Sequence, residues 1–291
     1  EHFDAVITTS PPHSTQLIGR KLKQKFSIHW MADLRDPWTD IYYDDLFPQT
    51  KWAKRKDLRL ERSVLENADD LIVVSESIKE LFLKKGNVSP TKVHVIPNGF
   101  DEKDFSQEII LDSVSPSEFR IAYTGTLSEH YPIEAFVGAL NQMDTSKIAL
   151  HFVGKINEKA TELLEPYSLQ LKGYVPHHES ISELLQADAL LLIIPKIENN
   201  EGILTGKLFE YLGSRKPIIF IGPPAGDAAT IVRECENGKI FDYHQTDEIT
   251  RYLNELIQAK AENRSVHTPN ETRIEEYSRK NLALRVKAML P

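Results

Sequence analysis

Short apolar runs alternate along the chain with longer segments whose apolar residues recur every three or four positions. The short runs predict strands, and the longer segments predict the helices between them. The predicted strands are Ala5–Thr9, Ile28–Ala32, Asp70–Val74, Val93–Ile96, Arg120–Thr124, Ala149–Val153, Leu169–Gly173, Ala189–Ile194, Ile218–Gly222 and Lys239–Phe241. Regular alternation of strand and helix predicts an α/β protein with parallel sheets and helices on both faces.

The strands fall into two groups, which predict two domains, residues 1–112 and 113–276. A polar, acidic stretch from Asp101 to Ser117 separates the groups and has linker composition. The last predicted helix, about Tyr277–Met289, has no strand after it, so residues 277–291 are expected to pack on elements already built. The first group has fewer strands than a typical doubly wound sheet and no initiator methionine precedes it, so we expect an amino-terminal portion of this domain to be missing.

Composition narrows the class of protein. The 291 residues are 41% hydrophobic, as in ordinary globular proteins, and long enough for two domains. A net charge of −8 argues against a nucleic-acid-binding protein but allows a local phosphate site. The single cysteine, Cys235, excludes an internal disulfide and fits a reducing compartment such as the cytoplasm. Neither a transmembrane-length apolar run nor a signal peptide is visible.

The segment Thr205–Pro217, TGKLFEYLGSRKP, follows a buried strand and begins a helix. Free N–H groups and the positive dipole end make such a helix start an anion site. Gly206 lets a phosphate approach the backbone, and Lys207 adds a mobile point charge. Glu210 lies three residues later on roughly the same face, where a carboxylate suits the paired hydroxyls of a ribose. Diphosphate plus ribose predicts a nucleotide.

The segment has two other interpretations. A P-loop needs four residues between its glycines and a hydroxyl residue after the lysine. Here Gly202 and Gly206 have three residues between them and Leu208 follows the lysine, so a P-loop nucleotide hydrolase is disfavoured. The other interpretation is an ordinary helix start, with Thr205 as N-cap and Lys207 solvated.

Two further strand ends carry candidate ligand contacts. Gly125 and Thr126 follow one strand, where a glycine either admits a phosphate to backbone N–H groups or forms a plain tight turn. Tyr174 and Val175 follow another and enter an extended X–Pro segment whose backbone could pair with the edge of a base.

Charged side chains cluster directly after strand Ile28–Ala32. Asp33, Arg35 and Asp36 come directly before Pro37 and Trp38, so two carboxylates flank an arginine next to a tryptophan. The arrangement is either an ion pair that shapes the loop or a polar site for a hydroxyl-rich acceptor, and we favour the acceptor site.

Seven segments occur in an order and spacing typical of one family. They are TSPPHS, ADLRDPW, ADDLIVVSESIKELF, KVHVIPNGFD, YTGTLSEH, LKGYVPHHE and TGKLFEYLGSRKPI. In these segments, which span nearly the whole chain, the sequence resembles the GT-B glycosyltransferases, specifically the large retaining family 4 that uses nucleotide-sugar donors. The resemblance implies two Rossmann-like doubly wound domains facing across a cleft. The donor would bind mainly to the second domain, the acceptor would lie on the first, and the terminal helix would cross back to the first.

The resemblance also implies roles in donor binding. Gly125 and Thr126 would line the phosphate loop, while Tyr174 and Val175 would meet the base.

At the helix start, Thr205, Gly206 and Lys207 would hold the diphosphate. Glu210 would bind the ribose hydroxyls, and Glu201 would approach the donor sugar as the first of the family's paired glutamates.

Two departures from the family pattern affect the catalytic residues, which are expected among Lys207, Glu201 and the loop of the first domain. The family usually places seven residues between its two glutamates, whereas Glu201 and Glu210 have eight between them. Many members carry a histidine where ADLRDPW stands, so the catalytic role there is open among Asp33, Arg35 and Asp36.

The implied activity is transfer of a sugar from a nucleoside diphosphate-sugar to a carbohydrate or lipid-linked acceptor, with retention, as in polysaccharide biosynthesis. The enzyme would be a hexosyltransferase that needs no metal and no cofactor. Two alternatives stay open: a nucleotide-sugar epimerase of the same fold, and a non-catalytic nucleotide-sugar-binding module or subunit. A cytoplasmic location is expected.

The predicted helix around Lys51–Arg62 is rich in lysine and arginine and carries Trp52 near its start. A basic amphipathic helix with an aromatic residue can lie on an anionic membrane, which would place the protein at the inner face of the membrane. A solvated charged face is the commoner explanation of such a pattern.

Overall fold

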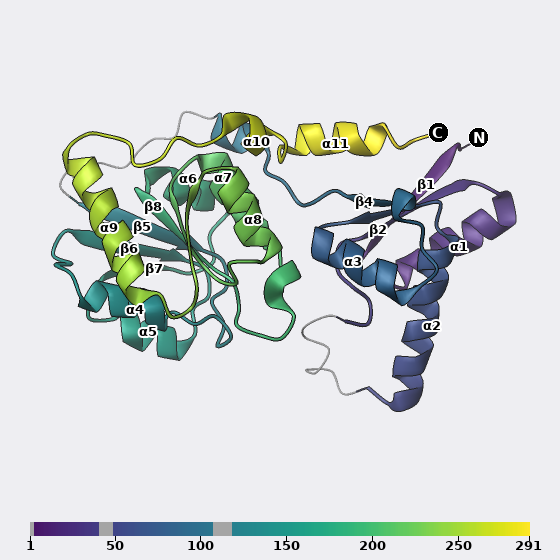
Figure 1. Cartoon of the computed structure of the whole chain (residues 1–291), viewed down its shortest axis with the longest axis horizontal. Coiled ribbons are helices and arrows are strands. Elements are labelled where there is room, and N and C mark those ends of the chain that lie inside the picture. The colour runs from purple at the N-terminus through teal and green to yellow at the C-terminus, as the bar shows by residue number, and fades with distance from the viewer. Residues whose placement is uncertain (1–2, 41–48, 107–117) are drawn as a thin grey trace. The chain divides into compact units, whose positions relative to one another are not determined.

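The computed structural model describes residues 3–40, 49–106 and 118–291 (Figure 1). Contacts divide the chain into two compact units. Unit 1 comprises Glu1–Asn98 and Asn281–Pro291, and unit 2 comprises Gly99–Lys280.

Unit 1 is built on a four-stranded parallel sheet. Its strands, in spatial order, are β1 (Ala5–Ser10), β2 (His29–Leu34), β3 (Asp70–Val73) and β4 (Val93–Val95). The helices between them are α1 (Thr15–Phe26), α2 (Lys51–Asn67) and α3 (Glu76–Lys85), and a short 3₁₀ helix, η2 (Pro90–Lys92), precedes β4. Because the spatial order of the strands follows the sequence, right-handed crossovers place all three helices on the same face of the sheet.

Alternate residues of the central strands of unit 1 enter two different cores. Trp30 of β2 packs with Leu65 of α2 and Phe82 of α3. Met31, the next residue of β2, faces the other side, because successive side chains of a strand point to opposite faces. There it packs with Leu282 of the last helix, α11 (Arg279–Lys287). The last helix therefore covers the face of the sheet that α1, α2 and α3 leave open.

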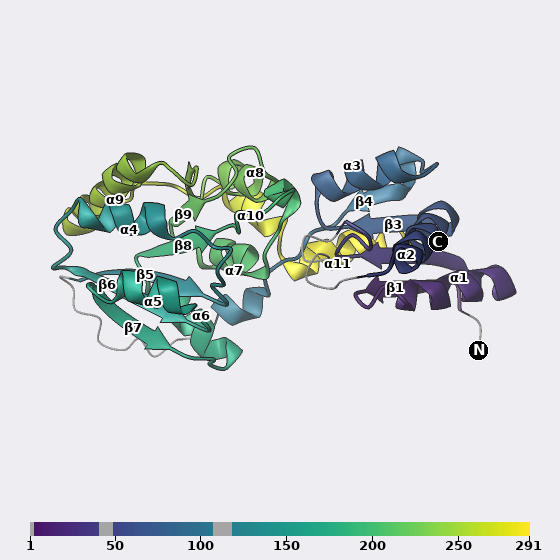
Figure 2. The same ribbon diagram turned by 90° about the horizontal axis from the view of Figure 1, so that it is seen from below.

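Unit 2 has a six-stranded parallel sheet with helices on both faces (Figures 1 and 2). In spatial order the strands are β10 (Gly238–Phe241), β9 (Ile218–Ile221), β8 (Ala189–Ile193), β5 (Phe119–Thr124), β6 (Ile148–Val153) and β7 (Ser168–Lys172). Its helices are α4 (Glu134–Asn141), α5 (Glu158–Leu164), α6 (His177–Gln186), α7 (Gly206–Ser214), α8 (Asp227–Glu234), α9 (Thr246–Ala261) and α10 (Glu271–Glu275), with 3₁₀ helices η3 (Glu102–Phe105) and η4 (Asn200–Gly202). This strand order is that of a Rossmann fold.

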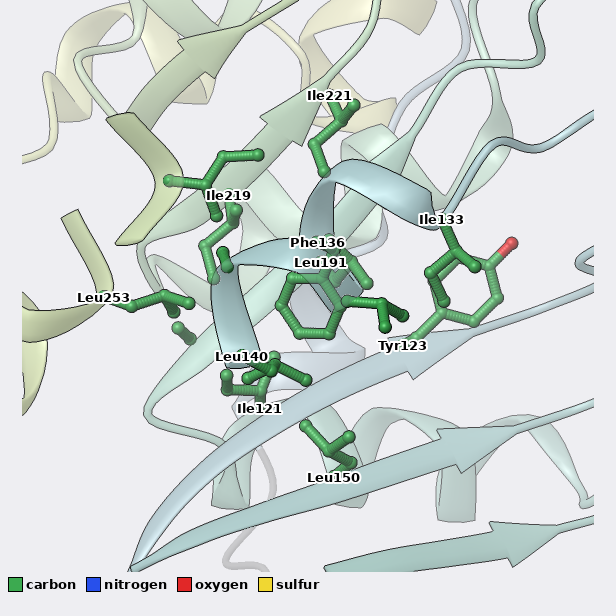
Figure 3. Packing of buried hydrophobic residues seen from close by; sticks show 14 of the residues in the cluster. Ile121, Tyr123, Ile133, Phe136, Leu140, Leu150, Leu191, Ile219, Ile221 and Leu253 are labelled. Carbon is green, nitrogen blue, oxygen red and sulfur yellow. The ribbon is translucent and has the colours of Figure 1, made fainter. Parts of the chain in front are cut away.

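The two faces of the second sheet form separate cores. Helices α4, α5 and α9 cover one face, and α6, α7 and α8 cover the other. Figure 3 shows part of the first core, where Phe136 and Leu140 of α4 lie among Ile121, Leu150 and Leu191 of the sheet. All ten predicted strands are present, and the α/β fold with two parallel sheets is confirmed.

The predicted linker, Asp101–Ser117, is described only as far as residue 106. The proposed boundary between residues 112 and 113 lies outside the described residues, and contacts divide the chain earlier, after Asn98. Phe100 is 1% exposed, and it packs with Phe105 against Gly213 of α7. The Asp101 carboxylate accepts a hydrogen bond from the N–H of Lys103 at the start of η3. Two phenylalanines thus anchor a stretch whose acidic residues suggested a linker.

Candidate functional site

The centre of the second sheet is a topological switch point. Strands β5 and β8 are neighbours, and the strand order reverses between them. The helices that follow them, α4 and α7, lie on opposite faces of the sheet. A crevice at the carboxyl ends of such strands is where open α/β sheets bind ligands. The segment Gly125–Thr126 leaves β5 here, and α7 begins after the loop that leaves β8.

Gly125 adopts a backbone conformation that favours glycine, with φ +104°. Its N–H donates to the carbonyl of Val153, 2.8 Å away. A Cβ atom added at Gly125 would lie 3.3 Å from both Cε and Nζ of Lys207. The structure therefore brings together two residues predicted to contact a diphosphate, although they come from different elements.

Lys207 is held by aromatic side chains. Its Nζ donates a 2.6 Å hydrogen bond to the hydroxyl of Tyr123 and lies 4.0 Å from the centroid of that ring. The Tyr131 ring is 5.6 Å from the same nitrogen. Burial lowers the pKa of Lys207 to about 7, against the opposing effect of the Glu210 charge. The alternative of an ordinary helix start with a solvated lysine is therefore wrong.

The start of α7 is open. Thr205 occupies the N-cap position without a side-chain capping bond, and its Oγ1 is buried with no partner among the described residues. A Cβ atom on Gly206 would meet nothing within 4 Å. Contacts within the chain therefore do not require glycine at this position, and there is space for a ligand to approach the helix start.

Glu210 lies one turn further along α7, beside His177 of α6. The Nδ1 nitrogen of His177 is 3.8 Å from Glu210 Oε1, and its Nε2 is 3.0 Å from Asp104 Oδ2. Burial raises the pKa of Glu210, and the His177 charge acts in the opposite direction. Sequence patterns did not indicate His177 or Asp104, although His177 stands only three residues after Tyr174.

The remaining predicted residues of unit 2 are more exposed. Tyr174 and Val175 lie between β7 and α6, and Tyr174 is 98% exposed. Glu201 lies in η4 with an exposed side chain. In the described part of the chain its carboxylate forms no hydrogen bond or ion pair, so no direct contact joins it to Lys207 or Glu210.

In unit 1, the Arg35 side chain makes three hydrogen bonds within the unit. Its guanidinium donates to Asp33 Oδ1 at 3.2 Å, to the carbonyl of Ile96 at 3.1 Å and to Asn98 Oδ1 at 2.6 Å. These bonds tie the loop after β2 to the segment after β4. Burial raises the pKa values of Asp33 and Asp36, although the charges of neighbouring basic groups lower them.

The same end of the first sheet holds a stacked pair of rings. His13 and Trp38 lie 5.3 Å apart between ring centroids with an interplanar angle of 14°. The His13 Nδ1 is buried without a partner among the described residues. Burial lowers the pKa of His13, and the nearby Asp36 charge opposes this effect. His13 thus lies near enough to the Asp36 charge to feel it, and its Nδ1 is free to bind a ligand.

Neither a metal cluster nor a membrane span emerges from the described residues. Within residues 3–40, 49–106 and 118–291, no group of three or more His, Cys, Asp or Glu side chains could hold a metal ion. Over the same ranges, no helix combines the length and apolar character needed to cross a membrane.

A family model and several solved structures match this chain, and they have the fold described above. Residues 1–99 match the family described as "Glycosyl transferase 4-like domain". No curated protein matches the sequence. Among solved structures, sucrose-phosphate synthase from Thermosynechococcus elongatus superposes with a TM-score of 0.70 at 18% identity, covering 99% of this chain and 73% of that chain.

Two other similar structures share this architecture. Anabaena HepE in complex with UDP gives a TM-score of 0.71 at 14% identity, covering 99% of this chain and 78% of that one. The lipopolysaccharide outer core galactosyltransferase WaaB gives 0.59 at 15% identity, with coverage of 98% and 74%. The chain therefore has the GT-B fold of these glycosyltransferases, and its residues 1–99 match a glycosyl transferase 4-like family.

Proposed function

We propose that the chain transfers a hexose from a nucleoside diphosphate-sugar to a carbohydrate or lipid-linked acceptor, with retention and without a metal. The observation that carries this proposal is the juxtaposition of Lys207, Gly125 and the open start of α7 at the switch point. A diphosphate can be bound by this combination of a lysine, a glycine beside it that lets phosphate approach the backbone, and the free N–H groups of a helix start. HepE, which has the same fold, has been crystallised with UDP-glucose, which makes this compound the first probe.

In this proposal each part of the donor has its own contact. The diphosphate lies between Gly125–Thr126 and the residues Thr205–Lys207. The ribose hydroxyls meet Glu210, the base meets Tyr174 and Val175, and the sugar approaches Glu201. Catalysis is then mostly positioning, together with stabilisation of the departing diphosphate by Lys207 and the helix start.

The acceptor is proposed to bind to unit 1. Because the Arg35 guanidinium is already bonded to Asp33, Ile96 and Asn98, its role there is to fix the loop. Asp36 and the neighbouring His13 are better placed to accept hydrogen bonds from acceptor hydroxyls.

The test is turnover of UDP-glucose and related donors by the Lys207→Ala variant. Loss of charge stabilisation at the leaving group should lower kcat by at least about 100-fold. Lys239→Ala is the matched control, because Lys239 also lies against a tyrosine, 4.7 Å from the Tyr252 ring, and is exposed. Undiminished turnover by Lys207→Ala would refute the proposed role.

The same assays separate the two alternatives. An epimerase converts the donor into an isomer without any acceptor, which product analysis detects. A binding module shows saturable donor binding with no consumption of donor in the presence of any acceptor tested.

We also propose that α2 contacts an anionic membrane at its cytoplasmic face. Six basic residues of this helix are exposed, namely Lys51, Lys54, Arg55, Lys56, Arg59 and Arg62. Trp52 is 69% exposed among them, with the Lys56 ammonium 5.3 Å from its ring centroid, and Leu58 is 49% exposed. Glu61, by contrast, is buried. In a chain of net charge −8, this face is a local basic surface suited to anionic headgroups.

A further inference from the structure

The partners of Lys207 are aromatic rather than acidic. Its ammonium meets the hydroxyl and the ring face of Tyr123, with Tyr131 further away. Within the part of the chain that the structure describes, no carboxylate lies at ion-pair distance from Lys207. Glu210, on the same helix, acts on it only from a longer range.

Tyr123 is held rigidly. It is fully buried in β5, and its ring stacks on Phe152 with a centroid distance of 5.3 Å. Its hydroxyl donates to the carbonyl of Thr126 at 2.9 Å, so the oxygen lone pairs are left to accept from Lys207. Burial raises the pKa of Tyr123, which keeps the phenol neutral. A neutral, immobile acceptor therefore fixes the lysine.

We propose that Tyr123 is a positioning residue that holds the Lys207 amino group beside Gly125, where the diphosphate of a nucleotide-sugar becomes its partner. This inference rests on the proposed function. Tyr123 comes from the strand that leads into the phosphate loop, so a single side chain links Lys207 on α7 to the Thr126 backbone of that loop. Donor binding would therefore exchange a neutral partner for a negatively charged one without moving the lysine far.

The exchange of the Tyr123 hydroxyl for a diphosphate predicts that donor binding is accompanied by uptake of a proton. Burial holds the pKa of Lys207 at about 7, and the groups that face it are the two neutral phenols and, at longer range, Glu210. A bound diphosphate favours the ammonium, so binding takes up a proton where the free lysine is partly neutral. The diphosphate of a nucleotide-sugar keeps its charge near neutrality. A fall in affinity above pH 7 would therefore arise from the titration of a group on the protein.

The decisive variant is Tyr123→Phe, which keeps the ring and removes the accepting oxygen. A hydrogen bond to the charged form of a group favours that form, so its loss shifts the lysine titration to lower pH. We expect UDP-glucose binding to weaken about tenfold at pH 8.5 and only about twofold at pH 6. Tyr252→Phe is the matched control, since Tyr252 belongs to the same core and its buried hydroxyl has no partner among the described residues.

The experiment is calorimetric titration with UDP-glucose from pH 6 to 8.5, in two buffers of different ionisation enthalpy. If Tyr123→Phe keeps the wild-type affinity and pH profile while Lys207→Ala loses binding, the positioning role is overturned and the donor site stands. If Lys207→Ala binds as well as wild type, the proposed donor site itself fails. Should Tyr123→Phe not fold, Tyr123→Met also removes the accepting oxygen, and a wild-type affinity and pH profile in that variant overturns the inference.

Discussion

His177 Nδ1 lies 3.8 Å from a carboxylate oxygen of Glu210, while the other ring nitrogen lies 3.0 Å from Asp104. The imidazole therefore stands between two carboxylates from different elements. At this distance the imidazole acts on Glu210 through its charge, and Glu210 is the carboxylate proposed to receive the ribose hydroxyls.

We predict that Glu210→Gln greatly reduces discrimination between UDP and 2′-deoxy-UDP. A charged acceptor for a hydroxyl is worth roughly 1.5–3 kcal/mol, so the wild-type chain should prefer UDP by at least about tenfold. In the variant the ratio of dissociation constants should fall to about two, which calorimetry measures. Glu201→Gln is the control, because it makes the same change at a glutamate proposed to contact the sugar. An unchanged ratio in Glu210→Gln would show that the ribose lies elsewhere.

Gly125→Ala is expected to weaken UDP-glucose binding by more than about 30-fold. Alanine would have to keep the positive φ of Gly125, which costs roughly 1–3 kcal/mol in backbone strain. Its Cβ would also lie 3.3 Å from the Lys207 ammonium and would displace the lysine. Gly173→Ala, where a Cβ would meet nothing within 4 Å, should bind normally. Equal binding by the two variants would argue against a close approach of phosphate to Gly125.

Glu183 makes the stability of unit 2 depend on pH. Its carboxylate binds His151 and Lys172, and these contacts lower its pKa to about 2 in the folded chain. The unfolded value is about 4.3, so the stabilisation is present above that pH and disappears as the pH falls towards 2. We predict that Glu183→Gln lowers the free energy of unfolding by about 2 kcal/mol at pH 7 and by about half as much at pH 3, where the carboxylate is protonated in the unfolded chain but still largely charged in the folded one. Urea denaturation at the two pH values measures this; an equal loss at both would mean that charge is not responsible.

Binding to vesicles tests the basic face of α2. The chain should bind vesicles containing anionic lipid but not neutral ones, and binding should weaken as salt rises. In the double variant Arg55→Glu/Arg59→Glu, the partition coefficient onto anionic vesicles should fall about 100-fold. Each basic residue removed costs about 1 kcal/mol of binding free energy, and the new negative charges cost more. The control, Lys239→Glu/Arg264→Glu, makes the same change in charge on unit 2. If both double variants lose binding equally, net charge rather than α2 is responsible.

Local patterns in the sequence predicted most of the fold. Most strands are short apolar runs, and runs such as Ala189–Ile193 are buried on both faces, so their type and extent follow from local composition. The helix start at Gly206 was likewise visible, because its signals are adjacent in sequence.

The contacts around the site could not be predicted in the same way. Tyr123 and Lys207 are far apart in the chain, and only the pairing of β5 with β8 brings their elements together. The same holds for His177 and Asp104 beside Glu210. The packing of Phe100 and Phe105 on α7 was also missed, because acidic residues around them dominate the local composition.

The order in which the chain is synthesised has a consequence for unit 1. One face of its sheet is covered by residues 281–291, which the ribosome adds only after all of unit 2 has been made. Met31, Ile72 and Ile96 therefore remain without their final cover throughout the synthesis of unit 2. The first sheet therefore gains this cover only after unit 2 has been made, so a nascent chain interrupted within unit 2 carries an apolar surface that chaperones can recognise.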